Sequence, residues 1–427
     1  MPELELRLQV GKYDVQKLLG KGSTGTVYLA KDTFTGRNVA LKTLEPEVFR
    51  DPRFGTVYRA QFLNEASLAG KLRHPHIVAI LDAVVGEESG HIAMELVIGG
   101  DLSQHSKPGT LLRPADVLQI AFKCCLAMDY AHREQGIVHR DLKPANIMIA
   151  GGTDIKIADF GAAFLKKSQP AHEAAMGSPY YMAPEVLRGE EPTFQSDIYS
   201  LGVVLYELLV GRRPFTADKL EALIEKITST EPRPPTELLK TLPREIDLVV
   251  LRALKKEPTH RYGTWAQFAV ELSKVIGLVQ PASAIADSEK YLAISKVEML
   301  QLLGDAEFWE LVGAAAWTRR DKGSVLLREN AKGTSFYFLA KGEVKVTKKG
   351  RLLSMIHEGE CFGEMAFIRG GEEPREATVE AVTDVVVAEF KPETLEGLNP
   401  SAQLHLTRAL VRNAVERLAL ANSRLAR

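Results

Sequence analysis

The sequence predicts an α+β fold with a β-rich segment, a large helical segment and then an antiparallel β-roll or jelly roll with flanking helices. Three observations carry this prediction. β-Branched and aromatic residues alternate with polar ones over residues 13–44, and apolar residues recur at helical spacing from Pro114 onward. Short β-type segments separated by glycines then fill residues 335–390.

Composition fits an ordered globular protein with more than one domain. The 427 residues are 45% hydrophobic and 26% charged, which is enough for two or three separate cores. The 54 basic and 55 acidic residues give a formal net charge of −1. This balance provides no electrostatic reason to expect nucleic acid or an anionic membrane as a partner.

The cysteines and the apolar runs indicate a cytoplasmic protein. Cys124 and Cys125 are adjacent in an apolar helical stretch, and Cys361 is the only other cysteine, so we expect free thiols in a reducing compartment. Residues 1–10 alternate Glu and Leu and contain no apolar signal core. No uninterrupted apolar run approaches the ~18–20 residues that span a bilayer.

The first part of the chain reads as strands followed by helices. Residues 13–44 predict hairpin strands separated by glycine-containing turns, and residues 59–72 predict a helix. Strand patterns resume over residues 78–97. Residues 114–132 predict a helix with proline in its first turn, and the pattern stays mostly helical to residue 278.

A short stretch without periodicity separates the two parts. Residues 279–289, which contain VQPASAIADS, predict a linker between domains at residues 10–278 and 290–427. A helical pattern over residues 289–316 follows, and a long amphipathic helix closes the chain at residues 401–425. The strands expected between these helices are residues 335–339, 343–347, 352–356, 377–382 and 385–390.

The most informative motif is HRDLKPAN at residues 139–146, followed by DFG at residues 159–161. It supplies a carboxylate, an ammonium, an amide and a second carboxylate, which phosphoryl transfer from a magnesium nucleotide requires. Their order and spacing resemble the catalytic and metal-binding loops of protein kinases. The wording DLKPAN resembles serine/threonine rather than tyrosine kinases.

A glycine-rich run precedes that motif. GKGSTGTV at residues 20–27 would by itself fit a plain hairpin turn, but VALK follows at residues 39–42. Together they resemble the protein-kinase nucleotide site, and the resemblance continues to about residue 278. It implies a bilobal protein-kinase fold that binds ATP and Mg²⁺ between a β-rich and a helical lobe. The residues expected at the nucleotide are Gly20, Lys21, Gly22, Ser23, Gly25, Val27, Ala40, Lys42, Met94, Glu95 and Val97.

The resemblance assigns catalytic roles one residue at a time. Lys42 would contact the α- and β-phosphates and be oriented by Glu65 on the following helix. Asp141 would accept or orient the proton of the substrate hydroxyl. Lys143 would steady the transferred phosphate.

The resemblance also assigns metal and scaffold roles. Asn146 and Asp159 would coordinate magnesium, which favours oxygen donors. Glu185 would form a structural ion pair with Arg261, and Asp197 would brace the catalytic loop from a buried helix. No expected catalytic residue is missing, so we expect an active enzyme. The non-enzyme alternative is a nucleotide-binding scaffold that signals by conformation.

The activation segment departs from the family pattern. Between Gly161 and Gly177 the only hydroxyl side chain is Ser168, so Arg140 would have only that residue to meet if it were phosphorylated. Control is therefore expected from elsewhere in the chain, namely from residues 290–427.

The C-terminal part carries a second resemblance. FYFLAKGEVKV at residues 336–346 resembles the central hairpin of a cyclic-nucleotide-binding β-roll, while residues 362–366 and 374–379 resemble its phosphate-binding cassette. Arg375 would contact the cyclic phosphate, and Glu364 would accept from the ribose 2′-hydroxyl. The residues expected to contact cyclic AMP or cyclic GMP are Gly363, Glu364, Met365, Ala366, Arg375, Glu376, Ala377 and Thr378.

Two features of this cassette are atypical. Glu364 and Arg375 are eleven positions apart where nine is usual, and Glu376 occupies a position where a small residue is typical. The charge of Glu376 would be unfavourable near a phosphate unless the side chain points outward. A degenerate β-roll that mediates dimerisation or docking therefore remains the alternative, and the final helix would form either a lid or a subunit contact.

The sequence as a whole predicts a serine/threonine protein kinase regulated by a cyclic nucleotide. Its partners would be protein substrates and the nucleotide effector, with homodimerisation as the alternative role of the β-roll. In the enzyme alternative the kinase is constitutive and the β-roll only assembles dimers.

Overall fold

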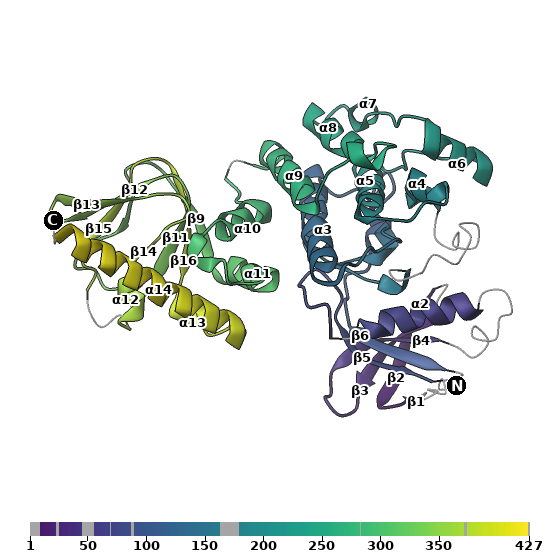
Figure 1. Ribbon diagram of the computed structural model, residues 1–427, viewed down its shortest axis with the longest axis horizontal. Coiled ribbons are helices and arrows are strands. Elements are labelled where there is room, and N and C mark those ends of the chain that lie inside the picture. The colour runs from purple at the N-terminus through teal and green to yellow at the C-terminus, as the bar shows by residue number, and fades with distance from the viewer. Residues whose placement is uncertain are drawn as a thin grey trace. The chain divides into compact units, whose positions relative to one another are not determined.

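The computed structural model describes residues 9–22, 25–44, 55–68, 70–86, 89–162, 179–281, 283–370 and 374–425 (Figure 1). The chain divides into two compact units, Met1–Val279 and Gln280–Arg427. Helix α9 ends at Val279 and α10 begins at Asp287, so the connection is shorter than the linker expected over residues 279–289. Within the described ranges, no helix combines the length and the apolar character needed to cross a membrane.

The first unit begins with a curled antiparallel sheet that confirms the strands expected over residues 13–44 and 78–97. Helix α2, Gly55–Ser67, ends earlier than the expected residue 72, ahead of Gly70, whose φ is +73°. The sheet order is β1 (Gln9–Val10), β2 (Tyr13–Gly22), β3 (Gly25–Asp32), β4 (Asn38–Leu44), β6 (Gly90–Glu95) and β5 (Ile80–Val85).

Two apolar clusters stabilise this sheet. Val39 and Leu41 of β4 are buried in one cluster with Tyr13. Ile92 of β6 belongs to the other, together with Phe62 of α2. The helix is therefore held against the sheet by its apolar side chains, which fixes the position of every other group it carries.

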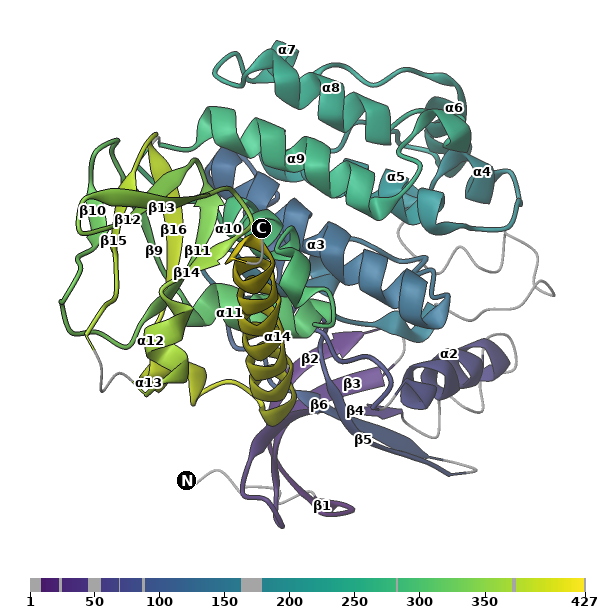
Figure 2. The same ribbon diagram turned by 60° about the vertical axis from the view of Figure 1, so that its left-hand side comes forward.

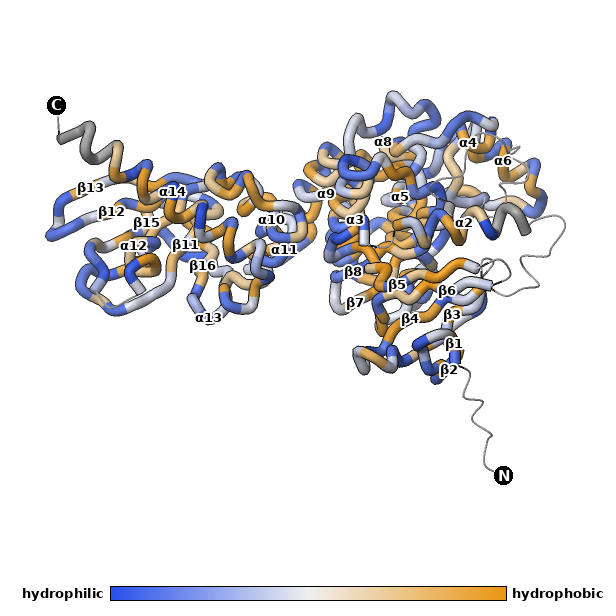
Figure 3. The backbone as a smooth tube through the Cα atoms, turned by 60° about the horizontal axis from the view of Figure 1, so that its bottom comes forward, coloured by the Kyte–Doolittle hydropathy of each residue, from blue (hydrophilic) through white to orange (hydrophobic). Residues whose placement is uncertain are grey.

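The second half of the first unit is helical, as expected. Helix α3 has proline at its first position and ends at Gly136, which adopts the left-handed conformation with φ of 64°. Helix α5 is buried along most of its length, and Figure 3 shows its apolar backbone colouring. The elements are α3 (Pro114–Gln135), β7 (Ile147–Gly151), β8 (Asp154–Ile157), α4 (Pro184–Leu187), α5 (Phe194–Val210), α6 (Leu220–Ser229), α7 (Pro235–Leu238), α8 (Arg244–Ala253) and α9 (Trp265–Val279).

The second unit contains two four-stranded antiparallel sheets, which confirms the expected β-rich architecture. Their orders are β10 (Val325–Leu327), β15 (Thr378–Ala381), β12 (Val344–Lys348), β13 (Arg351–Ile356), and β14 (Cys361–Phe362), β11 (Phe336–Lys341), β16 (Val385–Phe390), β9 (Ala316–Arg320). One buried cluster joins both sheets through Leu339, Val344 and Phe362. Strands β9, β10 and β14, which are two to five residues long, were not among the expected strands.

The described residues of this unit also form five α-helices. The helical pattern expected over residues 289–316 resolves into two helices and then strand β9, which begins at Ala316. Figure 2 shows the last helix running beside α12, and the two are in contact. The helices are α10 (Asp287–Ser295), α11 (Asp305–Ala314), α12 (Glu364–Ile368), α13 (Pro392–Leu395) and α14 (Pro400–Leu425).

A buried ion pair fastens α4 to the loop before α9. Both guanidinium nitrogens of Arg261 bond to the Glu185 carboxylate, Nη1 to Oε1 and Nη2 to Oε2, each at 2.7 Å. Both side chains are buried. This bidentate arrangement confirms the pairing expected between these two residues.

We expect Arg261→Met to lower the free energy of unfolding of the first unit by about 3–5 kcal/mol, because it leaves the Glu185 carboxylate buried without its partner. Hydrogen exchange of α5 peptides in the full chain measures this loss. Arg188→Met is the control, since its pair with Glu190 is exposed and should contribute less than about 1 kcal/mol. Equal effects of the two substitutions would contradict the prediction.

Candidate functional site

Three distant segments of the first unit meet at one ammonium group. Lys42 Nζ on β4 lies 2.7 Å from Glu65 Oε2 on α2 and 3.3 Å from Asp159 Oδ1. Burial by itself lowers the pKa of Lys42, but Asp159 and Glu65 raise it above its ordinary value. The ammonium therefore stays charged, and the expected contact between Lys42 and Glu65 is confirmed.

The sheet register brings the predicted nucleotide-binding side chains together. Val27 of β3 pairs with Lys42, and Ala40 pairs with Met94 of β6. Gly20 and Lys21 pair with the start of β3, where Gly25 has a φ of +144°.

Gly25 is also where another side chain would not fit. A Cβ at Gly25 would lie 2.3 Å from the backbone oxygen of Thr43, so this turn requires glycine. Gly22 ends β2, whereas Ser23 lies outside the described residues.

Glu95 ends β6, at the point where the chain leaves the sheet. Its backbone N–H donates to the Ala79 carbonyl at 2.9 Å, and its carboxylate lies 2.9 Å from Lys156 Nζ. Val97 follows two residues later. Lys156 was not selected from its sequence, because one more lysine in a strand has no distinguishing pattern.

The catalytic-loop candidates form a compact hydrogen-bonded group. Lys143 Nζ donates to Asp141 Oδ2 at 2.6 Å. Asn146 Nδ2 donates to the Asp141 carbonyl at 2.8 Å and to its Oδ2 at 3.1 Å. The Asp141 carboxylate is therefore held by two side chains of its own loop.

Asp197 of α5 braces this loop from below, as expected. Its carboxylate accepts the N–H of His139 at 2.6 Å and that of Arg140 at 2.8 Å. Arg140 has a φ of 69°, an unfavourable conformation for a non-glycine residue. The buried carboxylate holds this conformation because both amides point at it.

Asp159 also adopts a left-handed conformation, with φ of 63°, and Lys42 lowers the pKa of its carboxyl group. The preceding residue, Ala158, donates its N–H to the Asn146 carbonyl at 2.9 Å, so the two expected metal donors lie on adjoining segments.

Their donor set suits magnesium. Among the residues that the structure describes, no group of three or more His, Cys, Asp or Glu side chains could hold a metal ion. The oxygens of Asn146 and Asp159 would therefore hold Mg²⁺ together with oxygens from a nucleotide or water, the coordination that this ion prefers.

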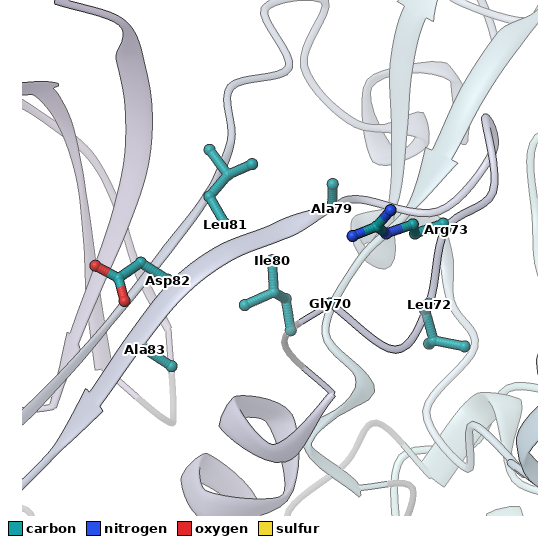
Figure 4. A pocket seen from close by; sticks show the side chains of 8 residues that line it. All are labelled: Gly70, Leu72, Arg73, Ala79, Ile80, Leu81, Asp82 and Ala83. Carbon is teal, nitrogen blue, oxygen red and sulfur yellow. The ribbon is translucent and has the colours of Figure 1, made fainter. Parts of the chain in front are cut away.

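A pocket of about 500 Å³ lies elsewhere in the first unit (Figure 4). It is lined by Gly70, Leu72, Arg73 and residues 79–83. None of the predicted site residues belongs to it. The activation-segment residues named in the sequence analysis, Ser168 and Gly177, lie outside the described residues.

In the second unit, Arg375 occupies a buried position in the cassette. Its Nη1 donates to the Gly363 carbonyl at 2.8 Å and its Nη2 to the Ser335 carbonyl at 2.6 Å. A Cβ at Gly363 would lie 3.0 Å from Nη1, so glycine leaves room for the guanidinium. Burial lowers the pKa of Arg375 from its ordinary value.

Glu364, the expected ribose acceptor, is paired with the final helix. Arg417 Nη1 of α14 bonds to Glu364 Oε1 at 2.7 Å, and its Nη2 donates to the Cys361 carbonyl at 2.6 Å. The sequence did not identify Arg417, because α14 carries several arginines with no spacing that marks one of them.

The other expected contacts are distributed around the cassette. Glu376 pairs with Arg369 at 2.7 Å and with Lys348 at 3.6 Å. Its carboxylate is therefore bound to two cations at the surface. Thr378 Oγ1 accepts the N–H of Glu329. Met365 and Ala366 lie on α12, and Ala377 precedes β15.

Comparison with known proteins is consistent with this division. Residues 13–272, more than half of the chain, match the family model described as a protein kinase domain. Residues 318–399 match the model described as a cyclic nucleotide-binding domain.

Three curated bacterial proteins illustrate the first match. A probable serine/threonine-protein kinase of Streptomyces coelicolor is 37% identical over 288 residues, 65% of this chain and 41% of that protein. Serine/threonine-protein kinase PknB of Mycobacterium leprae is 36% identical over 271 residues, and PknB of Mycolicibacterium smegmatis is 37% identical over 272. Each of these two matches covers 62% of this chain and 43% of the relative. The matched part therefore spans about two fifths of these relatives' length.

Proposed function

The chain belongs to the protein kinase family, and we propose that it transfers the γ-phosphoryl group of ATP to serine and threonine hydroxyls of proteins. The observation that supports this most directly is the triad of Lys42, Glu65 and Asp159 beside the Asp141 loop. A charged lysine and two oxygen donors placed next to the Asp141 carboxylate are the groups that phosphoryl transfer requires.

The proposed step is an in-line displacement at the γ-phosphorus. The substrate hydroxyl oxygen forms the new bond, the bond to the β–γ bridging oxygen breaks, and ADP leaves. Asp141 orients the hydroxyl and takes its proton, while Lys143 stabilises charge on the transferred group. Asn146 and Asp159 would hold Mg²⁺, which neutralises the phosphate charge when bound.

We expect Asp141→Asn to lower phosphate incorporation by roughly 10²–10⁴-fold, because an amide cannot accept the hydroxyl proton. Radiolabelled ATP, with casein and the chain itself as acceptors, measures transfer, and phosphoamino-acid analysis should find phosphoserine and phosphothreonine only.

Asp116→Asn serves as the control for this experiment. Asp116 pairs with Arg113 at the start of α3, so its removal should leave incorporation unchanged. Equal incorporation by wild type and Asp141→Asn would contradict catalysis and favour the scaffold alternative.

We also propose that the second unit binds a cyclic nucleotide and that binding changes the activity of the kinase. Arg375 supports this proposal, since among the residues that the structure describes its side chain donates two of its five N–H groups, to the Gly363 and Ser335 carbonyls. The outward placement of Glu376 removes the main objection from the sequence. Regulation further requires that the ligand bind two conformations of the chain with different affinity.

We expect Arg375→Ala to weaken cyclic-nucleotide binding by about 10–100-fold, because it removes charge-assisted hydrogen bonds to the cyclic phosphate. Calorimetric titration of the full chain with cyclic AMP and cyclic GMP, with ADP saturating the kinase site, measures the affinity. Arg375→Lys keeps the positive charge but lacks the paired N–H groups of a guanidinium, so it should retain partial binding.

Arg412→Ala is the matched control for Arg375→Ala. Arg412 lies exposed on α14 and pairs with Glu416, so this variant should bind like wild type. Absence of binding heat for wild type at millimolar ligand would overturn the proposal, as would wild-type affinity in Arg375→Ala.

A second role of this unit, dimerisation, is supported by an exposed apolar stripe on α14. Leu404, Val411, Val415 and Leu418 follow one another at intervals of seven, four and three residues, and all are about half exposed. The opposite face of the helix is buried through Ala402, Leu406, Ala409 and Leu410. Such spacing is typical of a helix that pairs with a second copy of itself.

We expect the double substitution Val411→Glu and Leu418→Glu to weaken self-association at least about tenfold, since it would bury carboxylates in an apolar seam. Sedimentation equilibrium of the full chain measures this change, with Arg412→Glu as a control beside the stripe. A wild-type chain that remains monomeric at high concentration would contradict the dimer.

A further inference from the structure

Strand β8, which ends two residues before Asp159, is joined to the segment that links α2 with β5. His76 Nδ1 lies 3.2 Å from the Ile155 carbonyl, and the Ile157 N–H donates to the His76 carbonyl at 2.9 Å. The Val78 N–H donates to the Ile157 carbonyl at 2.9 Å. The backbone of β8 therefore forms a continuous connection to the N-terminal sheet.

The alternate side chains of β8 are also anchored. Ile155 is fully buried, whereas Asp154 and Lys156 face the other way, as strand geometry requires. Asp154 binds the fully buried Lys123 of α3 at 2.6 Å. Lys156 forms its ion pair with a different element, at Glu95, the last residue of β6.

Two donors converge on one oxygen of Glu95. Lys156 Nζ lies 2.9 Å from Oε2, and the Ala79 N–H points at the same oxygen at 3.4 Å. The Glu95 N–H in turn donates to the Ala79 carbonyl. Ala79 lies beside Arg73 at the rim of the pocket in Figure 4. The side chain and the backbone of Glu95 are thus both held at the end of β6. This is where the chain enters the segment with Val97, which is expected at the nucleotide.

We propose that Lys156 is a positioning residue for ATP. Through the Glu95 carboxylate, it orients residues 95–97, the segment that follows β6 and is expected at the nucleotide. This inference rests on the proposed kinase function. Lys156 acts through Glu95, because its ammonium is bound to the Glu95 carboxylate. Strand β8 also leads into Asp159. The same strand would therefore position both Glu95, at the nucleotide segment, and Asp159, the expected metal donor.

The pair is partly exposed, with Lys156 17% and Glu95 35% accessible, so the effect should be modest. We expect Lys156→Met to raise both the KM and the Kd for ATP roughly two- to fivefold, as loss of a partly exposed ion pair would. The kcat should stay nearly unchanged, because binding is lost equally from the ground state and the transition state.

Substitutions at both ends of the pair test the mechanism. Lys156→Arg should restore ATP affinity, because it keeps the charge at Glu95. Glu95→Gln should weaken binding like Lys156→Met, and the double variant should be no weaker than either single variant. Lys255→Met is the control, since Lys255 pairs with Glu231 on the exposed surface and should leave the KM unchanged.

Two measurements on the full chain decide the inference. Calorimetric titration with ATP and Mg²⁺ gives the Kd without any transfer, and casein phosphorylation gives the KM and kcat. A lowered melting temperature with unchanged Kd in Lys156→Met would overturn the positioning role, and so would additive effects in the double variant. If wild type binds ATP but transfers no phosphate, the proposed function fails while the Kd comparison still tests Lys156.

Discussion

The buried contact of Lys42 with Glu65 and Asp159 is the constraint on which the first unit depends. An ammonium buried at the centre of a sheet is costly unless carboxylates surround it, and its two partners lie 23 and 117 positions away in sequence. Satisfying the charge therefore fixes α2 against the sheet and brings the loop after β8 beneath it. The folding constraint therefore brings together residues that the sequence assigned to the nucleotide and to the metal.

A second carboxylate makes the strained part of the site stable. Arg140 and Asp159 both have positive φ, which non-glycine residues adopt only when their surroundings impose it. At Arg140 the imposing group is Asp197, which is buried in helix α5. The cost of the unusual backbone is thus offset within a rigid core and not by the exposed loop itself. The backbone of His139 and Arg140 is thus positioned by a buried carboxylate, while Asp141 beside it remains partly exposed.

The sequence predicted those parts in which residue type and spacing encode the interaction. Lys42, Glu65, Asp141 and Asn146 belong to motifs, and the alternation over residues 13–44 marks strands because one face must be buried. Lys156 and Arg417 were not predicted, because an ion pair between distant segments produces no recognisable pattern in the local sequence. The direction of Glu376 was equally hidden, since it depends on Arg369 and Lys348 across the cassette. Strands as short as β14 carry too few residues for any period to appear.

In the cassette of the second unit, two functional candidates, Arg375 and Glu364, are also held by residues distant in sequence, but their partners differ. Arg375 is held by two backbone carbonyls, whereas Glu364 already has a cationic partner on α14. A ribose hydroxyl that used Glu364 would meet a carboxylate whose hydrogen-bonding capacity is divided with Arg417. Since Arg417 also bonds to the Cys361 carbonyl, any change at Glu364 is felt at the junction of α14 with β14. Glu364 is thus joined directly to the final helix, while the two side-chain bonds of Arg375 go to the Gly363 and Ser335 carbonyls.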